Sequence, residues 1–326
     1  MAIEVIKPGL STSVQDLGRP GYYHLGIPES GGMDHYALRA ANLLVGNDEG
    51  AAVLEATFQG PEVRFGTSAV VAVTGAELPP QLDGKACPTW TSFRVRAGQV
   101  LGFGFLKRGA RAYIAVAGGI DVPVVLGSRS TYALGALGGF QGRALRAGDV
   151  LPVGAPKDGS REGLSVPDSL RPVPPAVPHL RVLPGLYDFR VTKAALKGFF
   201  DDTWRVATEA DRIGYRFRGS RALEFVPRKQ PFGAGSDPSN IVDTCYPYGS
   251  IQIPGGSEPI VLHRDAVSGG GYFMIGTVIS ADMDLIGQMQ PNISTRFVPV
   301  DMDRALAARH EAGEQMVALR SSLASG

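Results

Sequence analysis

The chain is poor in cysteine, in long apolar runs and in net charge of either sign. Its two cysteines, Cys87 and Cys245, lie far apart, and the opening MAIEVIKPGL has no secretory leader. These features predict reduced, buried thiols rather than a disulfide framework or a thiolate metal site. Apolar stretches such as residues 68–75 are far shorter than the roughly 18 residues that a membrane span needs. We therefore expect a soluble, cytoplasmic protein with no membrane partner.

Charge and motif content exclude several classes of partner and enzyme. Lys and Arg number 32 against 31 Asp and Glu, and a net charge of +1 supplies no general field for nucleic acid. The sequence has no phosphate-binding loop ending in Gly-Lys-Ser or Gly-Lys-Thr, no Gly-x-Ser-x-Gly elbow and no His-Glu-x-x-His pair. The histidines are scattered, so we expect no metal site: His24, His35, His179, His263 and His310.

Glycine and proline are abundant instead. The chain of 326 residues holds 43 glycines and 24 prolines, whereas ordinary usage is roughly 7% and 5%. The apolar fraction of 44% is ordinary, so this excess does not indicate a low-complexity chain. It favours many short strands joined by tight turns over long helices. The composition therefore predicts a mostly β fold.

A proline-rich stretch divides the chain into two halves of similar length. Prolines recur from Leu151 to Pro178 with scattered charges and little periodicity, which is typical of a stiff, extended linker. We expect an N-terminal domain over residues 1–152, a linker over 153–178, a second domain over 179–300, and a C-terminal helix and tail over 301–326.

Apolar periodicity predicts the elements of each half. Short apolar or alternating runs closed by glycine indicate strands. Asp34 can cap a helix that ends before Gly46. The expected strands are residues 70–74, 100–105, 111–117, 250–253, 259–263, 276–279 and 295–300, and the expected helices lie between Asp34 and Gly46 and over residues 191–200 and 301–323.

Three glycine-framed polar segments could carry chemistry, and the first runs from Gly9 to Asp34. It holds Gln15, Asp16 and Arg19 among glycines that allow close main-chain approach. Such a loop can form a nest of amide donors for a carboxylate or a polarised carbonyl oxygen. The alternative is an ordered structural loop in which Arg19 and Asp16 pair.

The second segment runs from Gly118 to Gly142. Arg129 lies there between hydroxyl residues, in the sequence Ser128-Arg129-Ser130-Thr131. A guanidinium beside hydroxyl groups offers a planar fork for a carboxylate or a phosphate. The alternative is a turn held by local hydroxyl hydrogen bonds.

The third segment, from Tyr248 to Tyr272, is the sharpest candidate. A predicted strand leads directly into His263, Arg264 and Asp265, followed by Ser268 and three glycines. A carboxylate at a strand end, beside a loop with free amides, can serve as a general base while the amides hold an oxyanion. His263 alternates with core positions, and a buried structural histidine is the alternative for that residue.

With these segments in place, the chain resembles the urea amidolyase and 5-oxoprolinase family, in its second carboxyltransferase subdomain. Relatives of this type are known as the C-type subunit of bacterial 5-oxoprolinase, as allophanate hydrolase subunit 2-like proteins or as kinase-inhibitor-associated proteins. The resemblance covers nearly the whole chain, and long motifs recur in one order. These motifs are TSVQDLGRPGY (12–22), HLGIPESGGMD (24–34), ANLLVGNDEGAAVLE (41–55), GARAYIAVAGGIDVP (109–123), LGSRSTY (126–132), DRIGYRFRG (211–219), GSIQIP (249–254) and the segment 265–272.

The resemblance implies two cyclophilin-like β-barrel domains with a few short helices. It also implies a small kinase-inhibitor-like partner, corresponding to the B-type subunit of 5-oxoprolinase, and a third subunit or a biotin carrier. Family members open 5-oxoproline to glutamate with ATP, or transfer a carboxyl group from carboxybiotin to urea. The chain has no Ala-Met-Lys-Met segment. Biotin would therefore be supplied in trans, and ATP would be used on the partner subunits.

The chain departs from the family in its third segment. Family members commonly read Asp-x-x-Thr-Thr-Gly-Gly-Tyr-Pro-Lys, whereas this chain carries Ser268 at the first threonine, loses the second, and has Met274 instead of the lysine. Replacing an ammonium by a thioether removes a donor for anions. The substrate can therefore differ from 5-oxoproline and from urea.

Taken together, the sequence predicts a subunit of a heteromeric enzyme that acts on a lactam or a urea-like amide. Both reactions must polarise an amide carbonyl, a task for main-chain amides and a positioned carboxylate. The alternative is a catalytically inactive binding or regulatory protein that pairs with the kinase-inhibitor-like partner. The predicted catalytic residues are Asp265 as base or orienting carboxylate, Ser268 as oxyanion donor and Tyr272 as a ring against the ligand. The predicted substrate-binding residues are Gln15, Arg19, Arg129, Ser130, Gly269, Gly270 and Gly271.

Overall fold

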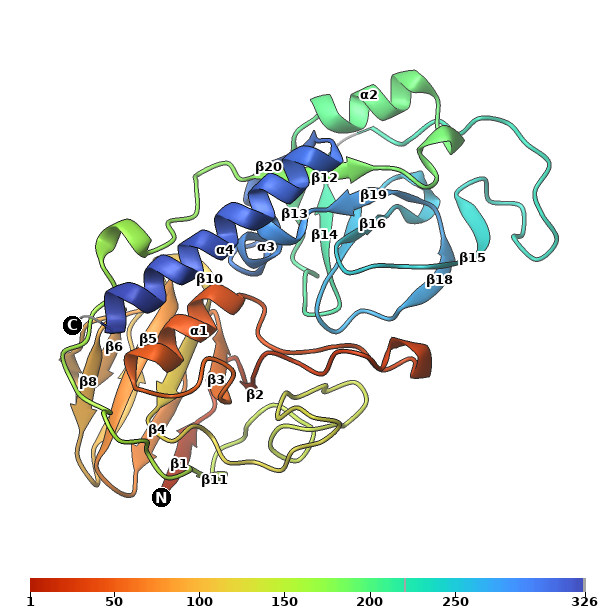
Figure 1. The fold of residues 1–326 in the computed structure, drawn as a ribbon. Coiled ribbons are helices and arrows are strands. Elements are labelled where there is room, and N and C mark those ends of the chain that lie inside the picture. The colour runs from red at the N-terminus through yellow and green to blue at the C-terminus, as the bar shows by residue number, and fades with distance from the viewer. Residues whose placement is uncertain (220, 325–326) are drawn as a thin grey trace. The chain divides into compact units, whose positions relative to one another are not determined.

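A computed structural model describes residues 1–219 and 221–324 of the chain (Figure 1). The chain forms two compact units that are not contiguous in sequence. Unit 1 contains residues 1–19, residues 30–173 and the chain from Glu314 on. Unit 2 contains residues 20–29 and 174–313. Thus a short N-terminal segment is part of unit 2.

Unit 1 is built from two antiparallel sheets. The six-stranded sheet has the order β11-β1-β4-β9-β6-β7, with β1 (Ala2–Lys7), β4 (Glu62–Phe65), β6 (Pro80–Leu82), β7 (Lys85–Ala86), β9 (Val100–Phe103) and β11 (Val150–Pro152). The five-stranded sheet has the order β2-β3-β10-β5-β8, with β2 (Ser11–Gln15), β3 (Val53–Thr57), β5 (Ala69–Glu77), β8 (Ser92–Val95) and β10 (Arg108–Val116). The connection after β11 includes a short 3₁₀ turn, η2 (Asp168–Leu170).

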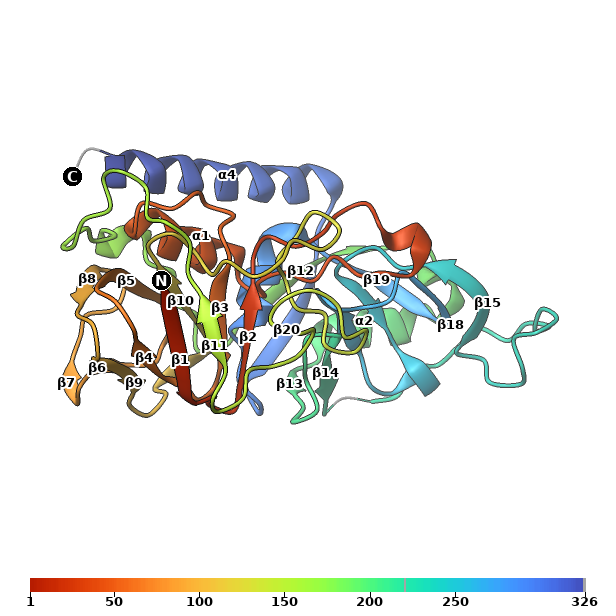
Figure 2. The same ribbon diagram turned by 90° about the horizontal axis from the view of Figure 1, so that it is seen from below.

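The five-stranded sheet is buried on both faces, and β10 shows why. Ile114 and Val116 belong to the core between the two sheets, whereas Tyr113 and Ala115 pack with helix α1 (His35–Leu44) on the other face. Figure 2 shows α1 on one side of this sheet and the six-stranded sheet on the other. Because successive residues of a strand point to opposite faces, burial on both faces requires a continuous apolar run.

Helix α1 begins as the sequence predicts. The side chain of Asp34 accepts a hydrogen bond from the amide of Ala37 at 2.9 Å, which satisfies one of the free amides of the first turn. Gly46 follows the helix with a φ of +77°, the left-handed conformation that glycine adopts without steric cost. The two ends of α1 are therefore encoded locally.

Unit 2 is a closed barrel of seven strands, in the order β12-β19-β16-β17-β14-β13-β20. These are β12 (His179–Pro184), β13 (Trp204–Val206), β14 (Gly214–Arg218), β16 (Ser250–Gln252), β17 (Ile260–Leu262), β19 (Met274–Val278) and β20 (Ser294–Pro299). The strands β12 and β20 pair in parallel. A separate two-stranded sheet pairs β15 (Asn240–Cys245) with β18 (Gly269–Tyr272).

Aromatic side chains fill one part of unit 2. The rings of Phe199 and Phe297 stack at 4.9 Å, and Phe217 meets Phe297 edge to face at 5.3 Å. The indole nitrogen of Trp204 donates to the carbonyl of Phe199 at 3.0 Å, so its polar group is satisfied inside the core. This cluster anchors α2 (Lys193–Asp201) to β13, β14 and β20.

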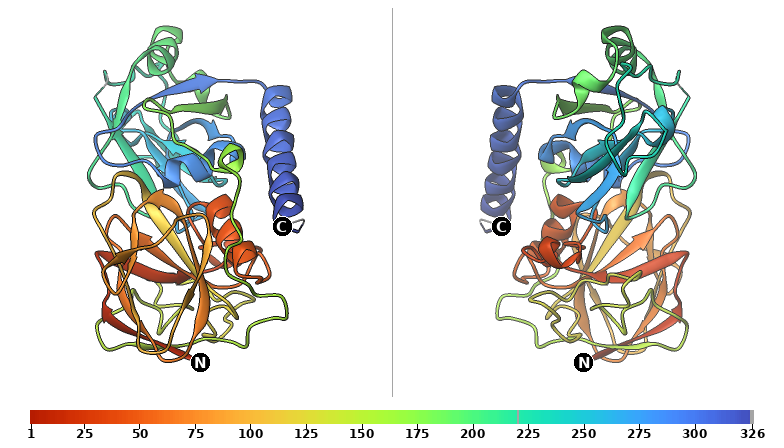
Figure 3. Two further views of the ribbon diagram at one scale, coloured as in Figure 1. Left: turned by 90° about the vertical axis from the view of Figure 1, so that its left-hand side faces the viewer. Right: turned by 90° about the vertical axis from the view of Figure 1, so that its right-hand side faces the viewer.

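The remaining helices are short except the last. Unit 2 contains α3 (Met283–Gly287) and the 3₁₀ turns η1 (Tyr23–Leu25), η3 (Asp188–Arg190), η4 (Pro254–Gly256) and η5 (Ser280–Asp282). Figure 3 shows α4 (Met302–Ala324) as one unbroken helix. Ala305 and Ala308 pack in unit 2, whereas Leu319 and Leu323 join the α1 cluster of unit 1. Within the described residues, no helix combines the length and the apolar composition needed to cross a membrane.

The structure confirms a mostly β fold with a few helices and a helical C-terminus. Two expectations are wrong. Both cysteines are free, but Cys245 is exposed on β15 and Cys87 is half-buried, because each lies in or directly after a strand at the edge of its sheet. The glycines 269–271, expected as an open loop, form strand β18, because β15 supplies an antiparallel partner for their backbone.

Candidate functional site

In unit 1, the carboxylate of Asp16 joins the first and second glycine-framed segments. It accepts hydrogen bonds from the hydroxyl of Ser128 at 2.6 Å, the amide of Arg129 at 2.6 Å, the amide of Gly18 at 2.8 Å and the hydroxyl of Ser130. The amide of Asp16 in turn donates to the Ser130 oxygen at 3.0 Å. Segments more than a hundred residues apart are thus held by one buried acidic side chain.

The predicted substrate-binding residues of unit 1 surround this joint. The side-chain amide of Gln15 donates to the carbonyl of Thr131 at 3.2 Å, and the fully buried Arg19 donates to the carbonyl of Ser130. The guanidinium of Arg129 donates to the carbonyl of Val122 at 2.7 Å and to Asp121 at 2.8 Å. These contacts favour a structural role for both segments, in which the hydrogen bond described for Arg19 is to the Ser130 carbonyl rather than to Asp16, and a role in substrate binding remains a prediction.

In unit 2, strand β17 leads directly into His263, as the sequence predicts. The histidine is fully buried, its Nδ1 accepts from the amide of Arg264 at 3.0 Å, and its Nε2 lies 3.1 Å from the carbonyl of Met283. An accepting Nδ1 requires the proton on Nε2, which donates to Met283. His263 therefore holds the turn after β17 against α3, which is the structural alternative for this residue.

Asp265 lies in the same turn and is bound by Arg212. The guanidinium Nε donates to Oδ2 at 2.8 Å and Nη2 donates to Oδ1 at 3.3 Å. The amide of Asp265 also donates to the carbonyl of Arg212 at 2.9 Å. With both oxygens engaged by one guanidinium, the geometry favours an orienting carboxylate over a free base. Arg212 was not predicted, although it lies in the DRIGYRFRG motif beside Asp211.

The serine and the glycine strand after Asp265 are tied into the fold. The hydroxyl of Ser268 donates to the carbonyl of Tyr23 at 3.0 Å, so it connects the N-terminal segment of unit 2 to β18. The hydroxyl of Tyr246 accepts from the amide of Tyr272 and donates to its carbonyl, both at 2.8 Å. The ring of Tyr272 is exposed, as a ring that contacts a ligand must be before binding.

The sequence analysis assigned no role to Arg264, a buried charged residue in the same turn as Asp265. Its guanidinium lies 4.4 Å from the ring centre of Tyr248, and its Nη1 lies 3.7 Å from the carboxylate of Glu29. Burial raises the pKa of Tyr248, and burial with the nearby charge of Glu29 raises the pKa of Tyr23 to about 12. Both tyrosines are therefore neutral hydrogen-bond donors at neutral pH. The sequence signal that could have identified Arg264 was a charged residue at the end of a predicted strand.

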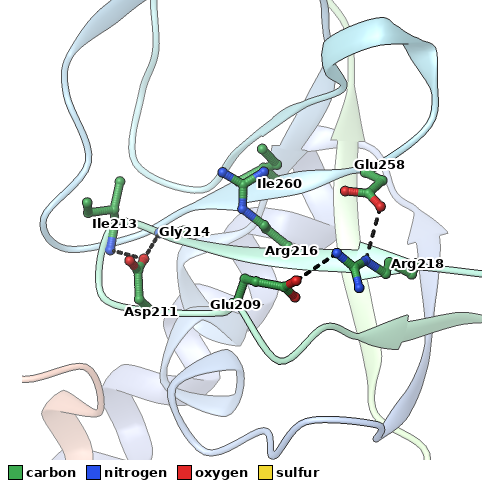
Figure 4. Close-up of a pocket in the computed structure, with 8 residues that line it drawn as sticks. All are labelled: Glu209, Asp211, Ile213, Gly214, Arg216, Arg218, Glu258 and Ile260. Atoms are coloured by element: carbon green, nitrogen blue, oxygen red, sulfur yellow. Dashed lines mark hydrogen bonds and ion pairs between the residues drawn. The ribbon is translucent and has the colours of Figure 1, made fainter. Parts of the chain in front are cut away.

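A separate hollow of about 440 Å³ lies on the outer face of unit 2, beside β14. Figure 4 shows Arg218 joined to Glu209 and Glu258, at 2.8 and 3.0 Å, while Asp211 binds the amides of the following turn. These side chains are exposed and carry both signs, so water screens their fields. The hollow is a weaker candidate for specific binding than the buried Arg264 region.

Neither the Arg264 region nor the hollow beside β14 has the ligands of a metal centre. Among the residues that the structure describes, no three His, Cys, Asp or Glu side chains gather as a metal site requires. The polar groups are guanidinium, hydroxyl and amide donors with one or two carboxylates. Such a set can bind an anionic group and polarise a carbonyl oxygen.

Comparison with known proteins shows the family to which the chain belongs. Residues 25–299 match the family described as carboxyltransferase domain, subdomain A and B. The chain is 37% identical over 311 residues to the C-type subunit of 5-oxoprolinase from Escherichia coli, covering 95% of this chain and 94% of that protein. It is 36% identical over 329 residues to urea amidolyase of Saccharomyces cerevisiae, covering 98% of this chain but 18% of that protein.

A solved structure is also similar over almost the full chain. The crystal structure of Kluyveromyces lactis urea carboxylase superposes with a TM-score of 0.91 at 34% identity, covering 98% of this chain and 29% of that one. The chain therefore spans less than a third of the urea carboxylase it resembles and about a fifth of the urea amidolyase.

Proposed function

Because this chain belongs to the carboxyltransferase domain family, subdomains A and B, we propose that it is the C-type subunit of a heteromeric, ATP-dependent 5-oxoprolinase. In this reaction the lactam of 5-oxo-L-proline is opened by water, giving L-glutamate, while ATP is hydrolysed. The observation that carries the proposal is the match in extent: this chain and the bacterial C-type subunit cover one another almost completely.

The polar groups of unit 2 suit the opening of a lactam. Opening requires the ring carbonyl to be held and polarised while its carbon is attacked. Tyr272 offers an exposed ring surface, and the two-point pair of Asp265 with Arg212 fixes the turn that leads to β18. We propose that these groups bind and orient the substrate, with Asp265 acting as a positioning carboxylate. Ser268 is the further donor proposed for the oxyanion, once its hydroxyl turns from Tyr23.

We assign ATP to partner subunits. The sequence has no phosphate-binding loop of the Gly-Lys-Ser or Gly-Lys-Thr type. The bacterial relatives are named as one subunit of 5-oxoprolinase, which supports an assembly with other chains. We propose a small kinase-inhibitor-like subunit as the first of these partners. Dependence on ATP fits the cytoplasmic location expected from the sequence.

Carboxyl transfer to a urea-like or lactam acceptor is the second candidate. It is supported by the close structural similarity to urea carboxylase over 98% of this chain. Biotin supplies an activated carboxyl group in such reactions, and this chain lacks the Ala-Met-Lys-Met segment to which biotin is attached. The biotin would have to be delivered by a carrier domain on another chain.

The test is to co-express the chain with the proposed partner subunits and purify the complex. We expect glutamate and ADP to form together from 5-oxoproline and ATP, and neither to form when this chain is omitted. Fixation of labelled bicarbonate onto urea, with a biotin carboxylase and carrier added, would support the second candidate instead. A complex that assembles but lacks both activities would support the regulatory alternative.

A further inference from the structure

Arg264 presents a buried guanidinium that the surrounding protein does not fully use. The residue is 8% exposed, and its Nε is buried without a hydrogen-bond partner among the described residues. The contact with Glu29, at 3.7 Å, balances charge but is too long to be a hydrogen bond. Buried donors of charged groups are costly to leave unpaired, so an unpaired one points to an absent acceptor.

A second unpaired donor lies beside it. The guanidinium packs over the ring of Tyr248, and the hydroxyl of that tyrosine is also buried without a partner in the described part of the chain. Burial keeps this hydroxyl protonated, so it can donate. Two donors on adjacent side chains, one charged and one neutral, match the two oxygens of a carboxylate.

The donors are held in place before any ligand binds. The amide of Arg264 is bonded to His263, and the neighbouring Asp265 is bonded to Arg212. Stacking on Tyr248 limits the rotation of the guanidinium. A preorganised site loses little conformational entropy on binding, which favours a small ligand.

We propose that Arg264 and Tyr248 bind the carboxylate of a small amide substrate. That the substrate is an amide rests on the proposed function; that it carries a carboxylate is inferred from Arg264 and Tyr248. 5-Oxoproline carries a carboxylate next to its lactam, whereas urea carries none. A guanidinium binds a carboxylate side-on through two N–H groups. The site therefore selects acidic lactams over neutral amides, and Glu29 disfavours ligands with a second negative charge.

The test is calorimetric titration of the full chain with 5-oxoproline, with 2-pyrrolidinone, which is the same lactam without the carboxylate, and with urea. We expect 5-oxoproline to bind at least about tenfold tighter than either neutral amide, as a hydrogen bond to a charged group predicts. Equal binding of the three compounds, or no binding of 5-oxoproline, would overturn the proposal.

Three variants locate the effect. Arg264→Met should weaken 5-oxoproline binding about a hundredfold and Tyr248→Phe about tenfold, since the first removes the charge and the second a single donor. Arg216→Met, at an exposed arginine on the outer face of β14, is the control and should bind as the parent does. Tyr248→Phe removes an unpaired hydroxyl, so its stability without ligand should be unchanged or higher. Parent-like binding by this well-folded variant would contradict the proposal.

Failure of the proposed carboxylate site can be distinguished from failure of the proposed function. If the assembled complex opens 5-oxoproline and Arg264→Met leaves KM unchanged, the carboxylate site is wrong and the proposed function stands. If the chain binds 5-oxoproline through Arg264 but the complex forms no glutamate, the site stands and the proposed function is wrong.

Discussion

Arg212 and Asp265 form a two-point ion pair across neighbouring strand ends, with Nε to Oδ2 at 2.8 Å and Nη2 to Oδ1 at 3.3 Å. The pair is possible because β14 and β17 are antiparallel neighbours, with Gly214 opposite Leu262. The register places Arg212, two residues before β14, opposite the turn after β17. The pair therefore locks the turn that also carries Arg264.

The first prediction concerns this pair. Asp265→Asn and Arg212→Met should each lower the free energy of unfolding by about 3 kcal/mol, because each leaves a largely buried charge without its partner. If Asp265 acts by positioning, the double variant should be no worse than the single ones. Chemical denaturation and kcat of the assembled complex measure both effects.

A general-base role for Asp265 has a different signature. In that case Asp265→Asn alone would abolish the acidic limb of the pH–rate profile, while Arg212→Met would keep it. Glu209→Gln, at an exposed ion pair in the same unit, provides the control and should change neither stability nor rate measurably.

The second prediction concerns the joint in unit 1. Asp16→Ala should destabilise the protein by about 3 kcal/mol, since several hydroxyl and amide donors lose their buried acceptor. Asp121→Ala removes an exposed ion pair with Arg129 and should cost about 0–1 kcal/mol. Urea denaturation of the two variants gives the comparison, and equal losses would refute the assignment of Asp16 as the joint.

The third prediction concerns Ser268. If its hydroxyl serves only to hold the carbonyl of Tyr23, Ser268→Ala should cost about 1 kcal/mol of stability and lower kcat less than tenfold. Loss of a true oxyanion donor lowers kcat by about 10²–10³. Steady-state kinetics of the complex therefore decide whether the hydroxyl turns to the substrate during the reaction.

The fourth prediction concerns alkaline pH. Burial is the main cause that raises the pKa of Tyr23, Tyr36 and Tyr246 to about 12 in the folded chain, whereas an exposed tyrosine ionises near 10. Because the unfolded chain releases these protons first, stability is unaffected below about pH 10 and falls as the pH rises from about 10 to about 12. Denaturation at pH 9 and pH 11, followed with tyrosinate absorbance, measures this; equal stability at the two values would contradict it.

Local sequence was sufficient for most elements and for the family. The strands β5, β10, β17, β19 and β20 and the helices α1, α2 and α4 lie close to where apolar periodicity and caps predict them. The third segment was also identified correctly as a strand that ends in charged residues. What periodicity could not predict was the edge pairing of glycines 269–271, because pairing depends on β15, a distant strand with no regular apolar pattern.

The amino-acid sequence by itself determined the β content, the helix ends and the family, since these depend on neighbouring residues and on motifs read along the chain. Tertiary structure alone decided which polar groups meet. The register of neighbouring strands brings Arg212 to Asp265, which lies 53 positions further along the chain. The path of the chain around the barrel brings Arg264 to Tyr248. Side-chain partners of this kind follow from how strands are ordered around a core, which no local preference specifies.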